Sequence, residues 1–138
     1  MVTLIPAAAP RILARESFAT QAYWTSGRSG VLHLARSKAS GRWLHPFWNI
    51  DESDPDVEIA PVSGRGTVFT YTVNCHAYNP QVPPPYVIAI VELVEQSDLR
   101  IVTNIVNCAP DAVGIGLPVR VAFEHHDPLY VPVFEPDL

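Results

Sequence analysis

Hydrophobic and polar positions alternate through the second half of the chain, in short runs that are typical of β-strands. Each run is rich in Val, Ile, Tyr, Phe or Thr and is bounded by Gly, Pro, Asn, Asp or Ser. No run is long enough for a helix of about ten residues or more. The predicted strands are Gly66–Asn74, Tyr86–Val94, Leu99–Asn107, Pro118–Glu124 and Tyr130–Phe134.

Strands of this number and spacing predict a mainly β fold, in which a five-stranded, partly closed Greek-key barrel of the OB type follows a short helix and a hairpin. Alternation assigns the side chains of each strand to two faces. Every second residue from Val119 to Phe123 is predicted on one face of the fourth strand. In the first strand, one face is predicted to carry Val68, Thr70, Thr72 and Asn74.

The second predicted strand is apolar on both faces over Val87–Val91. A strand of this kind is usually covered on both sides. We expect one face to lie against the barrel core. The other is expected to lie against the N-terminal region or another subunit.

A short helix is predicted before the barrel. Ser17 is a helix-capping residue type, and the helix is expected to run to about Ser26 and to stop at Gly27. Met1–Arg15, rich in alanine and proline, is expected to be a loose arm because these residues offer little to pack.

A small hairpin is predicted between the helix and the barrel, with strands at Val31–Ala35 and Arg42–His45 around a polar turn. The sequence therefore divides into an N-terminal arm and helix (1–29), a hairpin segment (30–60) and the barrel (61–138). The 138 residues fit one domain with a small appendage.

Charge and composition argue against nucleic acid, membranes and export. The chain carries a net charge of -5 with only nine Lys and Arg, which is a poor match to a phosphate backbone. No apolar run approaches the roughly 18 residues of a membrane span. The N-terminus has no basic segment ahead of its apolar stretch, which argues against a signal peptide. Two cysteines, Cys75 and Cys108, fit a reducing cytoplasm.

The order and spacing of several segments resemble those of a known family. The segments are SGRGTVFTYTV, PYVIAIVEL, LRIVTNIVN, DAVGIGLPVRVAFE and PVFEP. They are similar to the acyl-CoA-associated OB-fold proteins, in which a rubredoxin-like zinc ribbon precedes the barrel. The resemblance covers roughly Phe18 to Pro136 and implies an accessory protein of thiolase-like enzymes, whose partner supplies the catalytic residues.

The chain departs from this family at the zinc ribbon, which needs four thiolates, normally as two C-x-x-C knuckles. The first knuckle falls at Ser37 and Ser40, and the second falls within Asn49–Asp54, which holds no cysteine. Serine hydroxyls are not useful zinc ligands at neutral pH. We therefore expect no metal, and we expect this segment to be held by docking on the barrel or on a partner. The alternative ligand set is His45, Asp51, Glu52 and Asp54.

Other candidate groups have a structural alternative. Cys75 and His76 are adjacent, so in a strand their side chains point to opposite faces and do not form a nucleophile–base pair. We expect Cys75 and Cys108 to be buried structural residues. His125–Asp127 is expected to be a polar turn rather than a metal or acid–base cluster, and Glu92 to be exposed on the barrel face.

Five residues are candidates for contact with a partner or with CoA. Arg65 lies in the glycine-rich turn Ser63–Gly66, from which it could reach a CoA phosphate or a partner carboxylate, the alternative being a solvated arginine. Aromatic residues are enriched at interface hot spots but are equally ordinary core residues. The aromatic candidates are Trp43, Phe47, Trp48 and Tyr86.

The resemblance therefore implies a non-catalytic accessory subunit of a thiolase, acyltransferase or retro-aldolase. The resemblance implies that it stabilises this partner in a hetero-oligomer, such as a heterotetramer, and shapes the partner's CoA-thioester site. We expect no cofactor, nucleic acid or membrane partner, with a CoA thioester at the interface. Two alternatives stay open: a subunit contributing residues to an acyl-CoA hydratase or aldolase, and a single-stranded nucleic-acid-binding OB fold, which the acidic charge disfavours.

Overall fold

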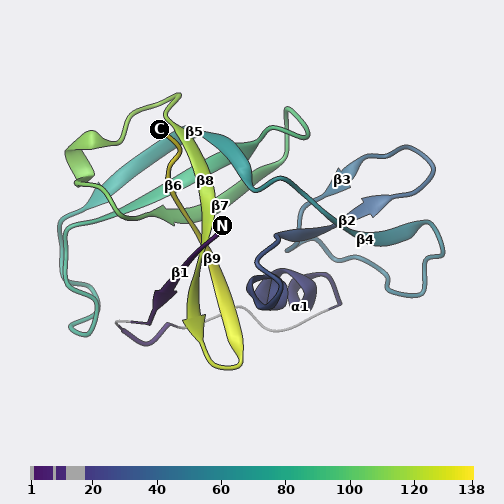
Figure 1. Cartoon of the computed structure of the whole chain (residues 1–138), viewed down its shortest axis with the longest axis horizontal. Helices are drawn as coiled ribbons and strands as arrows, with labels where there is room; N and C mark the ends of the chain where they lie inside the picture. The colour runs from purple at the N-terminus through teal and green to yellow at the C-terminus, as the bar shows by residue number, and fades with distance from the viewer. Residues whose placement is uncertain (1, 8, 12–17) are drawn as a thin grey trace.

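The computed structural model describes residues 2–7, 9–11 and 18–138. Two sheets form the molecule, a barrel and a smaller three-stranded sheet, and helix α1 (Phe18–Thr25) lies beneath the junction between them (Figure 1). No helix in the described ranges is long and apolar enough to span a bilayer.

The predicted barrel is confirmed. It is built from the strands β5 (Arg65–Asn74), β6 (Tyr86–Leu93), β7 (Arg100–Ile105), β8 (Pro118–His126) and β9 (Leu129–Pro136). Neighbouring strands pair in the order β8-β5-β6-β7-β9, and an antiparallel β8–β9 ladder closes the ring. β7 and β9 pair in parallel, with Ile105 opposite Phe134. A short 3-10 helix, η2 (Pro110–Ala112), lies in the β7–β8 connection.

The predicted faces of β8 are confirmed, but those of β5 are correct only for its first half. The ladder with β6 pairs Val68 with Val91 and Thr70 with Ile90, so Phe69 is an extra residue in a β-bulge. A bulge shifts the alternation by one position. Thr70 and Thr72 therefore lie on the opposite face from Val68, together with Ile90 and the other outward residues of β6. Simple alternation cannot locate such an insertion.

The expectation of a loose arm is wrong for its first part, because Thr3–Pro6 forms strand β1 in parallel with β8. β5 pairs only with the first residues of β8, and β1 pairs with Ala122–His125 beyond them. Thr3 also donates a hydrogen bond from its hydroxyl to Glu135, at 2.9 Å. Met1, Ala8 and residues 12–15 lie outside the described residues, as does Ser17, the predicted helix cap.

The predicted short helix is confirmed, since α1 ends at Thr25, but Gly27 is not the residue that terminates the helical segment. After α1 the chain continues as a 3-10 helix, η1 (Ser26–Arg28), and the left-handed residue is Gly30, with φ 74°. Gly27 is buried, and a Cβ on it would lie 2.5 Å from the Cβ of Tyr130. This glycine therefore permits close packing of η1 on β9.

The predicted hairpin is confirmed and belongs to the smaller sheet. Its strands are β2 (His33–Ser37) and β3 (Trp43–Leu44). A third strand, β4 (Val57–Pro61), pairs with the edge of β2 opposite to β3, so the sheet has the order β3-β2-β4. Buried side chains of this sheet and of α1, including Leu34, Trp43 and Tyr23, belong to the same hydrophobic cluster as the barrel residue Phe123. The two sheets therefore share one core.

Gln96 fastens the smaller sheet to the turn between β6 and β7. Its side-chain oxygen accepts a hydrogen bond from the Trp43 backbone N–H at 2.8 Å, and its Nε2 donates to the Trp43 carbonyl at 3.1 Å. Arg42 forms an ion pair with Asp98 in the same turn. The structure thus shows that this segment docks on the barrel of its own chain.

Candidate functional site

A cleft of about 660 Å³ lies on the outer face of β6 and β7. Its walls come from the described arm residues Ala9–Arg11, from α1, from the proline-rich β5–β6 loop and from β9. Most of the lining is apolar or aromatic, and clefts of this size and character commonly hold small molecules or peptide segments. Ile88 of β6 and Val102 of β7 form part of its floor and remain 37% and 60% exposed. The predicted cover on the outer face of β6 is therefore only partial within the described chain.

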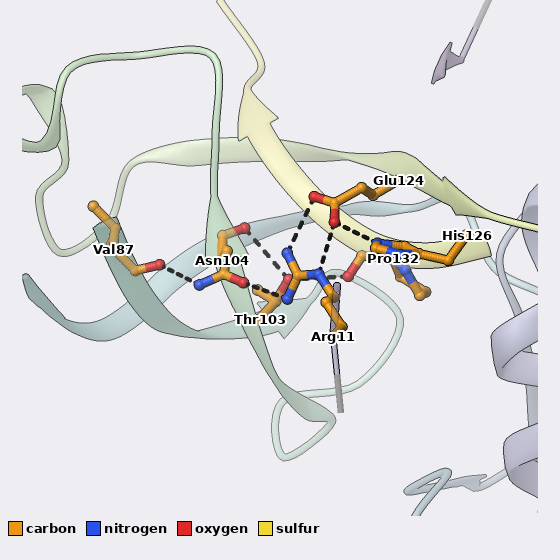
Figure 2. A network of polar contacts seen from close by, with 7 residues as sticks. All are labelled: Arg11, Val87, Thr103, Asn104, Glu124, His126 and Pro132. Carbon is orange, nitrogen blue, oxygen red and sulfur yellow. Dashed lines mark hydrogen bonds and ion pairs between the residues drawn. The ribbon is translucent and has the colours of Figure 1, made fainter. Parts of the chain in front are cut away.

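One side of the cleft carries a polar network that fastens the N-terminal arm (Figure 2). Arg11 donates from Nε and Nη2 to the two carboxylate oxygens of Glu124, at 2.8 and 3.1 Å. It also donates from Nη1 to Oδ1 of Asn104, at 2.9 Å. Nε2 of His126 lies 2.5 Å from Oε1 of Glu124. We call these four residues the Arg11 latch.

The latch joins segments that are far apart in the sequence, since Arg11 and Glu124 are separated by 113 residues. Their side chains are 30% and 15% exposed. Burial opposes ionisation of Glu124, but the hydrogen bonds from Arg11 and His126 outweigh it and hold the pKa of this carboxyl below its ordinary value. The carboxylate is therefore kept charged as the acceptor for both donors.

Two of the predicted contact residues line the cleft, namely Phe47 and Tyr86. Trp48 lies outside its lining but is 56% exposed beside Phe47, which is 42% exposed, and the ring of His45 contacts both. Phe47 packs in turn on the buried rings of Tyr23 and Trp24. These contacts make Phe47 and Trp48 the outer part of an aromatic cluster that is anchored in the core.

The remaining two contact candidates lie elsewhere. Trp43 is only 7% exposed, and the Arg36 guanidinium stacks on its ring at 5.0 Å, so it offers little surface to a partner. The Arg65 side chain is 70% exposed, and its Nε lies 3.7 Å from Asp137. Gly64 adopts a left-handed conformation with φ 76°, and Gly66 permits close packing, since a Cβ on it would lie 2.5 Å from the Glu92 carbonyl oxygen.

The ribbon-like segment has polar contacts at the predicted knuckle that do not suit zinc. Ser37 donates from its hydroxyl to Asp56 at 2.5 Å, and the Ala39 N–H donates to the same carboxylate at 2.8 Å. The Ser40 N–H donates to the Ser37 hydroxyl at 3.3 Å. The hydrogen bonds that the Asp56 carboxylate accepts, first from Ser37 and then from Ala39, hold its pKa below the ordinary value. The hairpin turn is thus tied to the chain before β4 by one carboxylate.

The zinc ion that the ribbon architecture implies does not fit this donor set. Hydroxyl groups occupy the first knuckle, and the described residues contain no group of three or more His, Cys, Asp or Glu side chains able to hold a metal ion. In the alternative ligand set of the Asp51–Asp54 loop, the Asp51 carboxylate accepts hydrogen bonds from the Ser53 N–H and hydroxyl, at 2.9 and 2.7 Å. That loop is therefore organised by its own hydrogen bonds.

The expectation of a buried Cys75 is wrong, because Cys75 follows the last residue of β5 and is exposed. Cys108 is half-buried against the core, and its burial raises the pKa of its thiol.

The predicted polar turn is shorter than expected, since His125 and His126 still belong to β8. His125 stacks on Tyr130 with a 4.5 Å centroid separation. Glu92 is 27% exposed on the barrel face and pairs with Arg100 at 3.1 Å.

Sequence reasoning did not single out Arg11, Asn104 or Gln96. Each acts through a partner far along the chain, and no local pattern marks such pairs. The described contacts of His126 and Glu124 connect them with each other and with Arg11, but not with a serine, threonine or cysteine nucleophile. The arrangement is suited to binding and positioning.

The strand order places the chain among OB-fold proteins, and comparison with known proteins identifies the family. Residues 60–124 match the family described as ChsH2, C-terminal OB-fold domain. The solved "Ltp2-ChsH2(DUF35) aldolase" superposes with a TM-score of 0.76 and 31% identity, over 91% of this chain and 100% of the matched chain. The protein therefore belongs to the ChsH2-type DUF35 family of OB-fold proteins, which confirms the predicted resemblance.

Several curated proteins are also similar in sequence. A probable enoyl-CoA hydratase alpha subunit from Thermomonospora curvata is 43% identical over 82 residues, or 59% of this chain. The 3-oxo-4,17-pregnadiene-20-carboxyl-CoA hydratase alpha subunit of Mycobacterium tuberculosis is 35% identical over 125 residues, or 86% of this chain. A DUF35 domain-containing scaffold protein from Methanocaldococcus jannaschii is 41% identical over 69 residues, or 49% of this chain. The matches span 25%, 38% and 48% of these relatives' own lengths.

Proposed function

We propose that this protein is an accessory subunit that docks on a thiolase-fold enzyme acting on CoA thioesters and contributes no catalytic residue of its own. The observation that carries the proposal is the aromatic cluster of Phe47 and Trp48, exposed on one side and anchored in the core on the other. Large aromatic side chains held rigidly at a surface are typical of interface hot spots. The family context agrees, since relatives are named as a scaffold protein and as enzyme subunits.

The cleft supports the same function, because its lining continues from Phe47 to Tyr86. A partner that covers Phe47 and Trp48 would also meet the apolar cleft floor at Ile88 and Val102. Such a surface is larger than the single exposed side chains found on any soluble protein. In this proposal the partner supplies the reactive groups, and the CoA thioester lies at the boundary between the two subunits.

Arg65 is proposed as the contact for a CoA phosphate or a partner carboxylate. Its long side chain is 70% exposed and pairs with Asp137 at 3.7 Å, and an exposed ion pair of this kind is weak enough to be exchanged for another anion. An arginine suits this role because its planar guanidinium pairs with phosphate or carboxylate in two-point geometry. Substitution Arg65→Ala is expected to weaken CoA-thioester binding by the complex while leaving subunit association intact. Loss of association instead would assign Arg65 to the protein interface.

A second candidate function is a subunit that contributes residues to an acyl-CoA hydratase or aldolase, as the names of two relatives suggest. Co-purification with a thiolase-fold enzyme tests the first function. Hydration of enoyl-CoA by the complex, abolished by changes in this chain without loss of assembly, would favour the second.

A further inference from the structure

The described end of the N-terminal arm forms one wall of the cleft and is fastened there by a single side chain. Ala9, Pro10 and Arg11 all line the cleft, and the Arg11 guanidinium reaches Glu124 and Asn104 at its edge (Figure 2). We propose that Ala9–Arg11 is a movable wall of the cleft, that the Arg11 latch holds it in place, and that release of the latch opens the cleft further to a docking partner. The inference rests on the proposed function only for the nature of that partner.

The socket for Arg11 is organised in advance by contacts that do not involve the arm. Asn104 donates from Nδ2 to the Val87 carbonyl at 2.8 Å, which turns its Oδ1 toward the guanidinium. His126 lies against one oxygen of Glu124, as described above. Two acceptors are therefore held in position on β7 and β8, and they match the forked donors of an arginine. A lysine, which presents a single ammonium, cannot satisfy both in the same way.

This wall is expected to be movable because little else fastens it within the described chain. Ala9 and Pro10 have small side chains, and the ion pair itself is partly exposed, a class of interaction that stabilises only weakly. β1 remains paired with β8 on the N-terminal side, so release is a local movement of the arm. Ile88 and Val102 line the same cleft and are 37% and 60% exposed, and they are apolar side chains of the kind that a protein interface covers.

Limited trypsin digestion of the whole chain tests the latch directly. Trypsin must take an arginine side chain into its own acidic pocket, so Arg11 cannot be cleaved while Glu124 holds it. Glu124→Gln is expected to raise the rate of cleavage after Arg11 by about three- to tenfold, measured by mass spectrometry. Cleavage after Lys38, in the exposed β2–β3 turn, is the internal standard. Glu92→Gln, which breaks the Arg100 ion pair on the same barrel, is the matched control and is expected to leave the rate unchanged.

Binding of Nile red, an uncharged dye, tests whether the cleft is opened further. Arg11→Ala, which does not alter the barrel, is expected to bind this apolar dye at least about threefold more tightly than the unaltered chain. Equal dye binding, an unchanged cleavage rate in Glu124→Gln, or an equal rise in Glu92→Gln would each overturn the proposal. The rate of cleavage after Arg11 is also measured at rising protein concentration. A rate that falls as dimers form would overturn the proposal, because Arg11 would then be held by Glu124 of a second copy and not by its own chain. None of these assays needs the partner enzyme, so their failure is distinct from failure of the proposed function.

Discussion

The side-chain amide of Gln96 makes two hydrogen bonds to the backbone of Trp43, one to its N–H at 2.8 Å and one to its carbonyl at 3.1 Å. A side chain of the barrel thus pairs with β3 much as a neighbouring strand would. This contact shows how a ribbon-like sheet stays attached to the barrel where the residues at its first knuckle do not suit zinc.

Gln96→Ala is expected to lower the free energy of unfolding by about 1–3 kcal/mol, because two hydrogen bonds are lost and the backbone groups of Trp43 lose their partner. Urea denaturation followed by tryptophan fluorescence measures this change. The matched control is Gln81→Ala in the exposed proline-rich loop, which is expected to be neutral. Equal stability of the two variants would show that the smaller sheet is held by other contacts.

Gly27→Ala is expected to destabilise the fold by about 1–3 kcal/mol, since the added methyl group would lie 2.5 Å from the Tyr130 Cβ and 2.8 Å from the Phe123 ring. The control is Gly114→Ala, where a Cβ meets nothing within 4 Å. Thermal unfolding of both variants provides the comparison. A Gly27→Ala variant as stable as Gly114→Ala would contradict the close packing of η1 on β9.

Glu124 is expected to make stability depend on pH in the acid range. Its pKa is lowered in the folded chain, because the hydrogen bonds from Arg11 and His126 outweigh the opposing effect of burial. Its contribution is therefore present above the ordinary glutamate pKa of about 4.3 and is lost as pH falls through the lowered folded value. The difference in unfolding free energy between the unaltered chain and Glu124→Gln should be about 1 kcal/mol at pH 7 and should shrink below about pH 4. A difference that is independent of pH would mean that the carboxylate charge is not what the latch uses.

Trp48→Ala is expected to weaken docking on the partner enzyme by about tenfold or more, because truncation of a hot-spot aromatic typically costs over 1 kcal/mol. Its side chain is 56% exposed, so the thermal midpoint of the isolated chain should change little. Ile115→Ala removes a side chain that is 76% exposed in the β7–β8 connection and serves as the control. Calorimetric titration of each variant into the partner gives the affinities. Equal affinity of the Trp48→Ala and Ile115→Ala variants for the partner would show that Trp48 does not lie in the interface.

The barrel could be predicted from the sequence because each of its strands carries its own local signal. The run around Val119–Phe123 alternates over its whole length, and the observed β8 agrees with it. β1 has no such signal: Thr3–Pro6 is short, and it is a strand only because β8 offers it a free edge. The bulge at Phe69 has no sequence signal either, since one inserted residue leaves the composition of the strand unchanged.

The site was predicted only in part, for a similar physical reason. Exposed aromatic residues near the ribbon-like segment could be identified as contact candidates, because residue type alone suggests the role. The Arg11 latch could not, since Arg11 meets Glu124 and Asn104 only after the barrel has closed. Cys75 was expected to be buried because of its residue type, but its place beyond the end of β5 leaves it exposed.

The most direct test of the docking function is the mass and activity of the chain mixed with a thiolase-fold enzyme from the same organism. We predict that light scattering after size-exclusion chromatography finds a stoichiometric hetero-oligomer, that the mixture turns over its CoA thioester, and that the chain alone does not. An isolated chain that elutes unchanged in the mixture, or that turns over the thioester unaided, would contradict the docking role.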